Sequence, residues 1–450
     1  MLFDFYLFWN ELIPETINYF AHLVKEADDG RHVVGAFYGY LYEFAGDPEF
    51  GHNAMASILA GKHLDFMGVT ASYFNRQSAT GGDYARSPVA SVRLHGKVWY
   101  HDNDAASFRT RQILEAAGWK DDDPDWTRNL TVQLPSLGYT PTAEASRWMY
   151  QRGFGFAMCQ GMAHAWFDLH GGYFDAPELM EEIARLNRLA VQAESWDRSS
   201  IAEILVVADE NSCAWCRPRS PLLRQLLLTP QNSLLRIGAP VDHILLGDLE
   251  SLDTKSYKLV IFLNCFRVMP SMRQTIARKL KRDGKHLLWC SAAGWFSDEQ
   301  GSVEQCRDLT GFQLVRTADA ASPFVAHPDE SKHRLDDFLD VRPIYHKDRS
   351  GWTSLWSPAA DLSASEFRGI ARRAGIHIFN EQDDVLYACR SLICLHAQAD
   401  GQRILTFPAL VNLRDAVTGN MLGTSVKQWR QDFRAGQTRL LYWQEASTSH

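Results

Sequence analysis

Residues 91–104 read SVRLHGKVWYHDND, a hydrophobic run that ends in acidic and polar side chains. Three similar runs accompany it: RHVVGAFYGYLYEF at 31–44, LDFMGVTASYFNR at 64–76 and GMAHAWFDLHGGYFD at 161–175. Helix-forming stretches separate the four runs. Strands that alternate with helices predict a parallel sheet with right-handed crossovers. The first part of the chain, residues 1–197, is therefore expected to be an α/β domain.

The predicted strands carry aromatic and polar residues at their carboxyl ends. In parallel sheets these ends meet at one edge, and ligands bind there. The residues that we expect at this edge are Tyr40, Glu43, Tyr73, Arg76, Trp99, Asp102, Asp104, Trp166 and Asp168. Together they are a more specific signal than any one of them.

Composition narrows the class of protein. The chain has 450 residues, of which 46% are hydrophobic and 22% charged, as in soluble globular proteins with two or three domains. A net charge of −8 argues against nucleic acid as a partner, because no basic surplus exists to meet phosphates. The sequence lacks both an apolar run long enough to cross a membrane and a signal-peptide pattern at its start.

Cysteine usage favours the cytoplasm. Eight cysteines are spaced irregularly, which suits a reducing compartment. The pair Cys213 and Cys216 has the spacing of a zinc or redox half-site, but no second such pair follows. We therefore expect structural thiols, with no metal and no cofactor.

Two further units follow the first. Short apolar strands alternate with helices over 198–325, which predicts a three-layer α/β domain without a phosphate-binding glycine loop. After a linker rich in Pro, Asp and Lys, successive strands with turn signals over 335–450 predict a small antiparallel β-sandwich.

Two tail stretches, AGIHIF and DDVLYACRSLICLHA, complete the pattern of the three units and the four runs. With them, the chain resembles the β-galactosidase-like glycoside hydrolases of family 42. The resemblance implies a (β/α)8 barrel, a flavodoxin-like trimerisation domain and a small β-sandwich. It implies a carbohydrate substrate of the β-galactoside type. It also implies assembly into a homo-oligomer, such as a trimer.

The resemblance also implies residue roles. Relatives have a nucleophilic Glu at the end of barrel strand 7, and Asp102 occupies that place with a side chain one methylene shorter. Trp166 and Asp168 resemble the tryptophan and acid after strand 8, and Tyr73 and Arg76 resemble a strand 6 end. Tyr40, Trp99 and Asp104 are expected to contact the substrate with them.

Only barrel strands 5–8 are found in residues 1–197, and the acid/base Glu of strand 4 is not among them. Glu43 is the best local candidate for a second carboxyl. Asn10 and Glu11 look like the Asn-Glu pair that marks such an acid, but they lie at the start of a helix-favouring run over 9–28, with Pro14 as a first-turn signal, and not after a buried strand. The chain is thus expected to be a truncated or mis-started product, to pair with a polypeptide that supplies strands 1–4, or to self-associate.

Two other readings stay open. A non-catalytic carbohydrate-binding or assembly protein would need neither the missing acid nor a Glu at position 102. A flavodoxin-like redox or amidotransferase-like module would rest on the middle unit and its cysteines alone.

Overall fold

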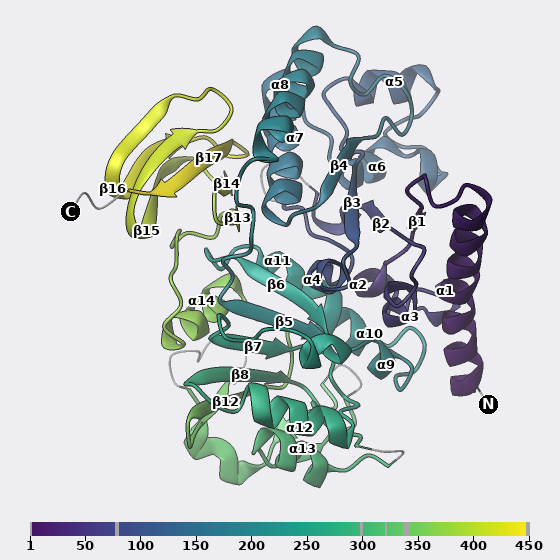
Figure 1. Ribbon diagram of the computed structural model, residues 1–450, viewed down its shortest axis with the longest axis vertical. Coiled ribbons are helices and arrows are strands. Elements are labelled where there is room, and N and C mark those ends of the chain that lie inside the picture. The colour runs from purple at the N-terminus through teal and green to yellow at the C-terminus, as the bar shows by residue number, and fades with distance from the viewer. Residues whose placement is uncertain (1, 77–80, 298–299, 320–321, 336–342, 447–450) are drawn as a thin grey trace.

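The computed structural model describes residues 2–76, 81–297, 300–319, 322–335 and 343–446. Its described strands form three main sheets along the chain (Figure 1). None of the helices in this described part is long and apolar enough to cross a membrane.

The first sheet is parallel, with the order β1-β2-β3-β4. Its strands are β1 (Gly35–Phe37), β2 (Phe66–Thr70), β3 (Val98–Asn103) and β4 (Ala163–Trp166). The helices around it are α1 (Leu2–Ala27), α2 (Leu41–Phe44), α3 (Met55–Leu59), α4 (Val89–Leu94), α5 (Thr110–Ala116), α6 (Leu130–Leu137), α7 (Ala143–Cys159) and α8 (Pro177–Ala193).

Several expected elements differ from this description. In the run 91–104, the residues up to Leu94 belong to helix α4 and strand β3 begins only at Val98. The run 31–44 forms a strand only at Gly35–Phe37, because the chain then turns and Leu41–Phe44 becomes helical. The first helix begins at Leu2 rather than at residue 9, and Pro14 lies inside it rather than in its first turn. Asn10 thus lies within a helix, as expected, where its amide donates to the carbonyls of Tyr6 and Pro48.

The second sheet has six strands in the order β11-β12-β8-β7-β5-β6. Five are parallel, in the order of doubly wound, flavodoxin-type sheets. The strands are β5 (Ile204–Ala208), β6 (Val241–Leu245), β7 (Leu259–Phe262), β8 (Lys285–Cys290), β11 (Tyr345–Arg349) and β12 (Trp352–Ser357). Its helices are α9 (Glu210–Cys213), α10 (Pro221–Leu223), α11 (Thr229–Leu234), α12 (Pro270–Lys279), α13 (Val303–Thr310) and α14 (Ala364–Arg373).

The expected boundary between the second and third units is therefore wrong. Strands β11 and β12 lie within the 335–450 segment, yet β12 pairs in parallel with β8 along six residues, from Trp352 to Ser357. Pairing with β8 covers an edge that would otherwise be open, so this strand completes the middle sheet. A separate hairpin, β9 (Leu314–Arg316) and β10 (Phe324–Ala326), lies beside it in sequence.

The third sheet is a single antiparallel sheet of five strands, in the order β13-β14-β17-β15-β16. They are β13 (Val385–Ala388), β14 (Leu392–His396), β15 (Gly401–Asp415), β16 (Met421–Phe433) and β17 (Thr438–Glu445). A sandwich of two sheets, as expected from the sequence, is not seen among the described residues. Register shifts bend β15, which pairs with both β16 and β17, so one sheet covers its own apolar core.

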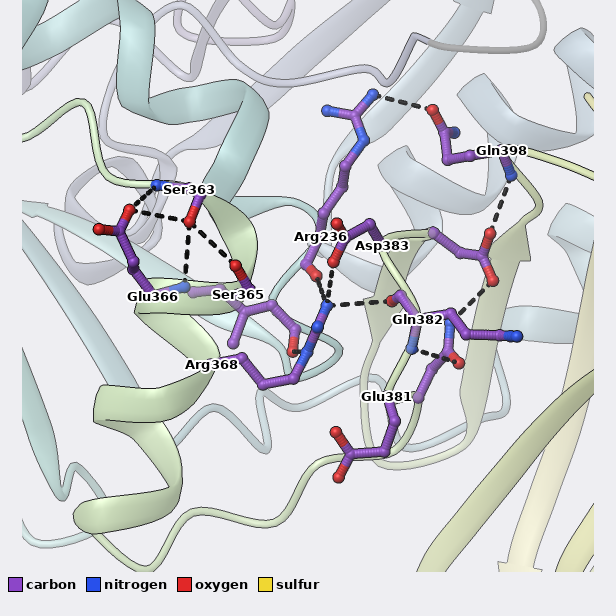
Figure 2. Close-up of polar contacts among 12 residues, drawn as sticks. Arg236, Ser363, Ser365, Glu366, Arg368, Glu381, Gln382, Asp383 and Gln398 are labelled. Carbon is purple, nitrogen blue, oxygen red and sulfur yellow. Dashed lines mark hydrogen bonds and ion pairs between the residues drawn. The ribbon is translucent and has the colours of Figure 1, made fainter. Parts of the chain in front are cut away.

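A buried arginine joins the second unit to the third (Figure 2). Arg368 on α14 donates to the carbonyls of Ile237 at 2.9 Å and Gln382 at 3.1 Å, and it pairs with Asp383 at 2.8 Å. Ser363 begins the same helix with a capping box closed by Glu366. The cap fixes where α14 starts, and Arg368 then fixes where the helix lies.

Candidate functional site

Register decides which side chains of the first sheet face the same way. Asp102 pairs with Thr70 of β2 and Ala165 of β4, so its side chain shares their face of the sheet. Trp99 and His101 lie on the opposite face, against which the helices pack; the His101 ring contacts Phe156 of α7. We call these the inner face and the helix face.

Asp102 is buried and only partly satisfied. Asp102 is 4% exposed, and its Oδ1 atom has no hydrogen-bond partner among the described residues. Burial, and then the nearby Asp104 carboxylate, raise the pKa of Asp102 to about 6. A free oxygen on a buried carboxyl at a strand end is what a nucleophile or a proton-holding acid requires.

Asp104 is held from both sides. Its Oδ1 accepts from Arg76 and its Oδ2 accepts from the Tyr73 hydroxyl at 2.6 Å. Arg76 is also over the Tyr73 ring, 4.5 Å from the centroid. Burial and Asp104 raise the pKa of Tyr73 to about 12, so its hydroxyl remains a donor. These three predicted residues therefore meet, but Asp104 has both oxygens engaged by protein.

Glu43 is also engaged, by a residue that the sequence did not single out. Arg86 reaches Glu43 Oε2 with Nη1 at 3.1 Å, and the Ser72 hydroxyl donates to Glu43 Oε1. Both charged side chains of this ion pair are 4% exposed. With both oxygens occupied, Glu43 is poorly placed to donate a proton to a substrate.

Arg86 organises the aromatic residues at the same edge. Its guanidinium carbon lies 4.6 Å from the ring centroids of both Tyr40 and Tyr73. It also donates to the Ala71 carbonyl at 3.0 Å. Arg86 lies in the segment QSATGGDYARS, which the glycine and serine content made look like a simple loop; residues 77–80 of it are outside the described part. A Tyr and an Arg at the end of such a loop were the only available signal.

The two predicted tryptophans do not face the substrate side of the sheet. Trp99 is 1% exposed and packs on the helix face, under Gly39. Trp166 pairs with Asn103 in register, and its Nε1 donates to Asn187 of α8 at 2.9 Å. Neighbouring side chains in a strand point to opposite faces, so a shift of one residue along the strand decides whether a tryptophan faces the substrate side or the helices.

Asp168 closes a turn. Its carboxylate accepts from the backbone N–H groups of Gly172 at 2.6 Å and Tyr173 at 3.0 Å. These bonds close the loop over Asp168–Tyr173 and account for an Asp at this position without a ligand. Asp168 and Trp166 are thus explained by the packing and turn after β4.

A buried ion pair behind the site supports Arg76. Arg152 of α7 contacts Asp83 at 2.8 Å and donates to the Arg76 carbonyl at 3.1 Å. Burial opposes ionisation of Asp83, but Arg152 holds its pKa below the usual value. The Tyr387 hydroxyl of β13 donates to the Asp83 carbonyl at 2.6 Å, so the third sheet is connected to the site through this pair.

Burial raises the pKa values of Cys213 and Cys216, whereas the contact with Cys159 lowers the pKa of Cys389 to about 7. All eight cysteines are free, and Cys213 is buried, with the Asn264 amide 3.4 Å from its sulfur. Burial raises the pKa of Cys216 to about 12, which disfavours a reactive thiolate.

Solved structures share the overall fold. A β-galactosidase from Rahnella sp. R3 matches 99% of this chain and 68% of its own, at 12% identity and a TM-score of 0.61. A β-galactosidase from Halorubrum lacusprofundi matches 98% and 68%, at 14% identity and a TM-score of 0.60. A GH42 β-galactosidase from G. stearothermophilus matches 89% and 67%, at 11% identity and a TM-score of 0.50.

The chain has a β-galactosidase-like fold. It spans about two thirds of the length of the solved structures that it matches. No family model and no curated protein matches the sequence. At such low identity the β-galactosidase-like fold is established by shape, and the chemistry must be argued from the residues.

Proposed function

We propose that the chain is a β-galactosidase-like, retaining glycoside hydrolase of carbohydrate metabolism, in a truncated form that lacks the acid/base half of its barrel. The first sheet would be barrel strands 5–8, and Asp102 at the end of β3 would be the nucleophile. One observation supports this most: Asp102 is a buried carboxyl on the inner face, with an unpartnered oxygen and a pKa of about 6.

The proposed step is attack by Asp102 on the anomeric carbon of a β-galactoside. A covalent glycosyl-enzyme forms and the leaving group departs with the bonding electrons. Above pH 6 Asp102 is mostly a carboxylate, as the step requires. Arg76 pairs directly with Asp104 and not with Asp102. Its positive charge still favours the ionised form of Asp102, while the Asp102 oxygens stay out of that ion pair.

Retaining hydrolysis needs a second carboxyl about 5–5.5 Å from the first, which protonates the leaving group. Glu43 was the candidate, and its ion pair with Arg86 argues against that role. The second carboxyl would therefore come from outside the first sheet. An Asp in place of Glu also sets the attacking oxygen about 1 Å back, which can cost about 100-fold in rate.

The engaged Glu43 favours a second candidate function, a non-catalytic carbohydrate-binding or assembly protein derived from such an enzyme. That protein would keep the sugar-facing edge and need no proton donor. Either function is consistent with a homo-oligomer, for which the resemblance implies a trimer as one form.

Hydrolysis and binding separate the two functions. We expect the purified chain to hydrolyse 4-nitrophenyl β-galactoside weakly, and Asp102→Asn to abolish that activity. Asp121→Asn, at an exposed carboxylate paired with Arg111, is the control and should change nothing. Saturable galactose binding by calorimetry without any turnover would favour the binding protein. Absence of both binding and turnover would contradict both functions.

A further inference from the structure

A polar cavity of about 490 Å³ lies in the second unit, at the carboxyl end of α13. In Figure 1, α13 lies at the end of the second unit that is farther from the first sheet. The charged side chains that line the cavity are Lys281, Arg307, Lys347 and Arg349, with the two carboxylates Asp308 and Glu330. Positive charge is thus in excess here, although the whole chain carries a net charge of −8.

Strand and helix geometry explain why these cations meet. Lys347 and Arg349 are two residues apart on β11, so their side chains share one face of the strand. Helix α13 ends where Gly311 takes a left-handed conformation, with φ at +84°. The Gly311 carbonyl accepts from Lys347 at 2.9 Å and from Arg349 at 3.0 Å, and the Leu309 carbonyl accepts from Lys281 at 2.6 Å. The negative end of the α13 dipole therefore gathers three cations.

The backbone carbonyls leave most of this positive charge unmatched. Glu330 is buried and pairs with Lys347 at 2.6 Å. Lys281, Arg307 and Arg349 form no ion pair with any carboxylate in the part of the chain that the structure describes. Asp308, the other carboxylate of the cavity, is exposed to solvent. Three cations thus converge on one cavity without direct contact to a negative charge.

Lys281 is the most confined of the three. Burial, and then the neighbouring Arg349 and Arg273, lower the pKa of Lys281 to about 8. Its ammonium lies 5.1 Å from the centroid of the Trp352 ring, which supplies no full negative charge. An ammonium has three N–H groups, and the Leu309 carbonyl takes one of them. An anion in the cavity would accept from the others and relieve the repulsion.

The size and the charge of the cavity indicate the class of ligand. Pockets for small molecules have volumes of roughly 300–1,000 Å³, a range that includes this one. Four cations against two carboxylates match a phosphate group, which carries close to two negative charges at neutral pH. Lys and Arg are common donors to phosphate oxygens. Nucleic acid fits less well, because it needs basic side chains along many phosphates rather than in one cavity.

We propose that this cavity binds a small compound that carries a phosphate group, with Lys281, Arg307 and Arg349 as the donors to its oxygens. Gln313 and Asp308 also line the cavity and are exposed, so they can hydrogen-bond the hydroxyl groups of a phosphorylated sugar. The site shares no residue with the strand ends around Asp102, and it does not depend on the proposed function.

Isothermal titration calorimetry of the full chain tests the proposal. We expect glucose 6-phosphate to bind at least about tenfold more tightly than glucose, because only the ester offers charged oxygens. Lys281→Met and Arg307→Gln should each weaken binding of the ester by about tenfold. Arg282→Gln is the matched control, because Arg282 follows Lys281 directly but pairs with Asp283 at 2.9 Å and does not line the cavity. It should weaken binding by less than about twofold.

Inorganic phosphate distinguishes the two sources of the group. Equal affinity for phosphate and for the ester would identify the free ion as the ligand, and tighter binding of the ester would identify a sugar phosphate. Bound ligand of either kind should protect Lys281 from acetic anhydride, as measured by peptide mass spectrometry, and should leave the exposed Lys255 reactive.

Three results would overturn the proposal: equal affinity for glucose 6-phosphate and glucose, unchanged affinity in Arg307→Gln, or an equal loss in Arg282→Gln. Arg307 is exposed, so its replacement decides the outcome even if Lys281→Met fails to fold.

Discussion

Among the acidic residues at the strand ends, Asp102 is set apart by an oxygen that has no partner among the described residues. Asp104 and Glu43 each have both oxygens bound by Arg, Ser or Tyr side chains. Among these three carboxylates, Asp102 thus combines a raised pKa with an oxygen that is buried and unpartnered. Reactivity at this edge depends on which carboxylate the arginines leave free.

The raised pKa predicts a pH-dependent effect on stability. Since the folded pKa of Asp102, about 6, exceeds its unfolded value, folding favours the protonated form. The charged form destabilises the fold increasingly as the pH rises from 4 to 6, and fully above 6. Asp102→Asn should therefore raise the free energy of unfolding by on the order of 1 kcal/mol more at pH 8 than at pH 4.5.

Urea unfolding at the two pH values measures this difference, with Asp121→Asn as the control. An equal effect of Asp102→Asn at both pH values would show that Asp102 titrates normally.

The buried pair of Glu43 and Arg86 predicts a non-additive response. Removing one partner leaves a buried charge unpaired, so Glu43→Gln and Arg86→Met should each cost about 3 kcal/mol. The double variant should cost less than the sum of the two. Chemical denaturation of the three variants gives the coupling energy, and simple additivity would mean that the pair does not form.

The sequence predicted part of this site. Tyr73, Arg76, Asp102 and Asp104 were expected at one edge, because carboxyl ends of parallel strands meet there, and they do lie together. It did not predict which side chains face inward. That choice depends on alternation within a strand, and the run 91–104 does not reveal where β3 starts, because its first residues belong to helix α4. Arg86 was missed because its loop has no periodicity.

At the scale of elements, helix α8 is the easiest to recognise in the sequence, because its buried residues Leu179, Ile183, Leu186 and Leu189 recur at helical spacing. Strands were harder. The run 31–44 is apolar throughout, and apolarity alone does not separate a strand from the short helix α2. Strand β12 joins the second sheet because it pairs with the open edge of β8. These two strands are far apart in the sequence, so local sequence patterns do not predict that they pair.

Helix α14 offers a matched test of how elements are joined. Arg368 is buried and donates to carbonyls of both neighbouring segments, whereas Arg372 on the same helix forms an exposed pair with Glu381. Arg368→Met should lower the free energy of unfolding by about 2–3 kcal/mol, because it leaves buried carbonyl groups without a hydrogen-bond donor. Arg372→Met should cost less than about 1 kcal/mol.

Thermal unfolding of the two variants decides between these expectations. Equal losses would mean that Arg368 contributes no more than a surface ion pair.

For the whole molecule, the three sheets have unequal cover. The second sheet has helices on it and an antiparallel edge strand, and the third has its own core. The first sheet exposes Phe37 and Val98 on its inner face, and the neighbouring helix α1 exposes Phe8 and Tyr19. The exposed face carries Asp102 at its carboxyl end. The sheet that carries Asp102 is thus also the least covered of the three.

The central claim is that Asp102 is a glycosidase nucleophile whose proton donor lies elsewhere. An activated substrate bypasses the donor: in 2,4-dinitrophenyl 2-deoxy-2-fluoro-β-galactoside the leaving group needs no proton, and the fluorine slows release of the sugar. Peptide mass spectrometry after incubation should find the fluorogalactosyl group on Asp102, and no adduct in Asp102→Asn. An adduct on another carboxylate, or an unlabelled protein, would contradict the claim.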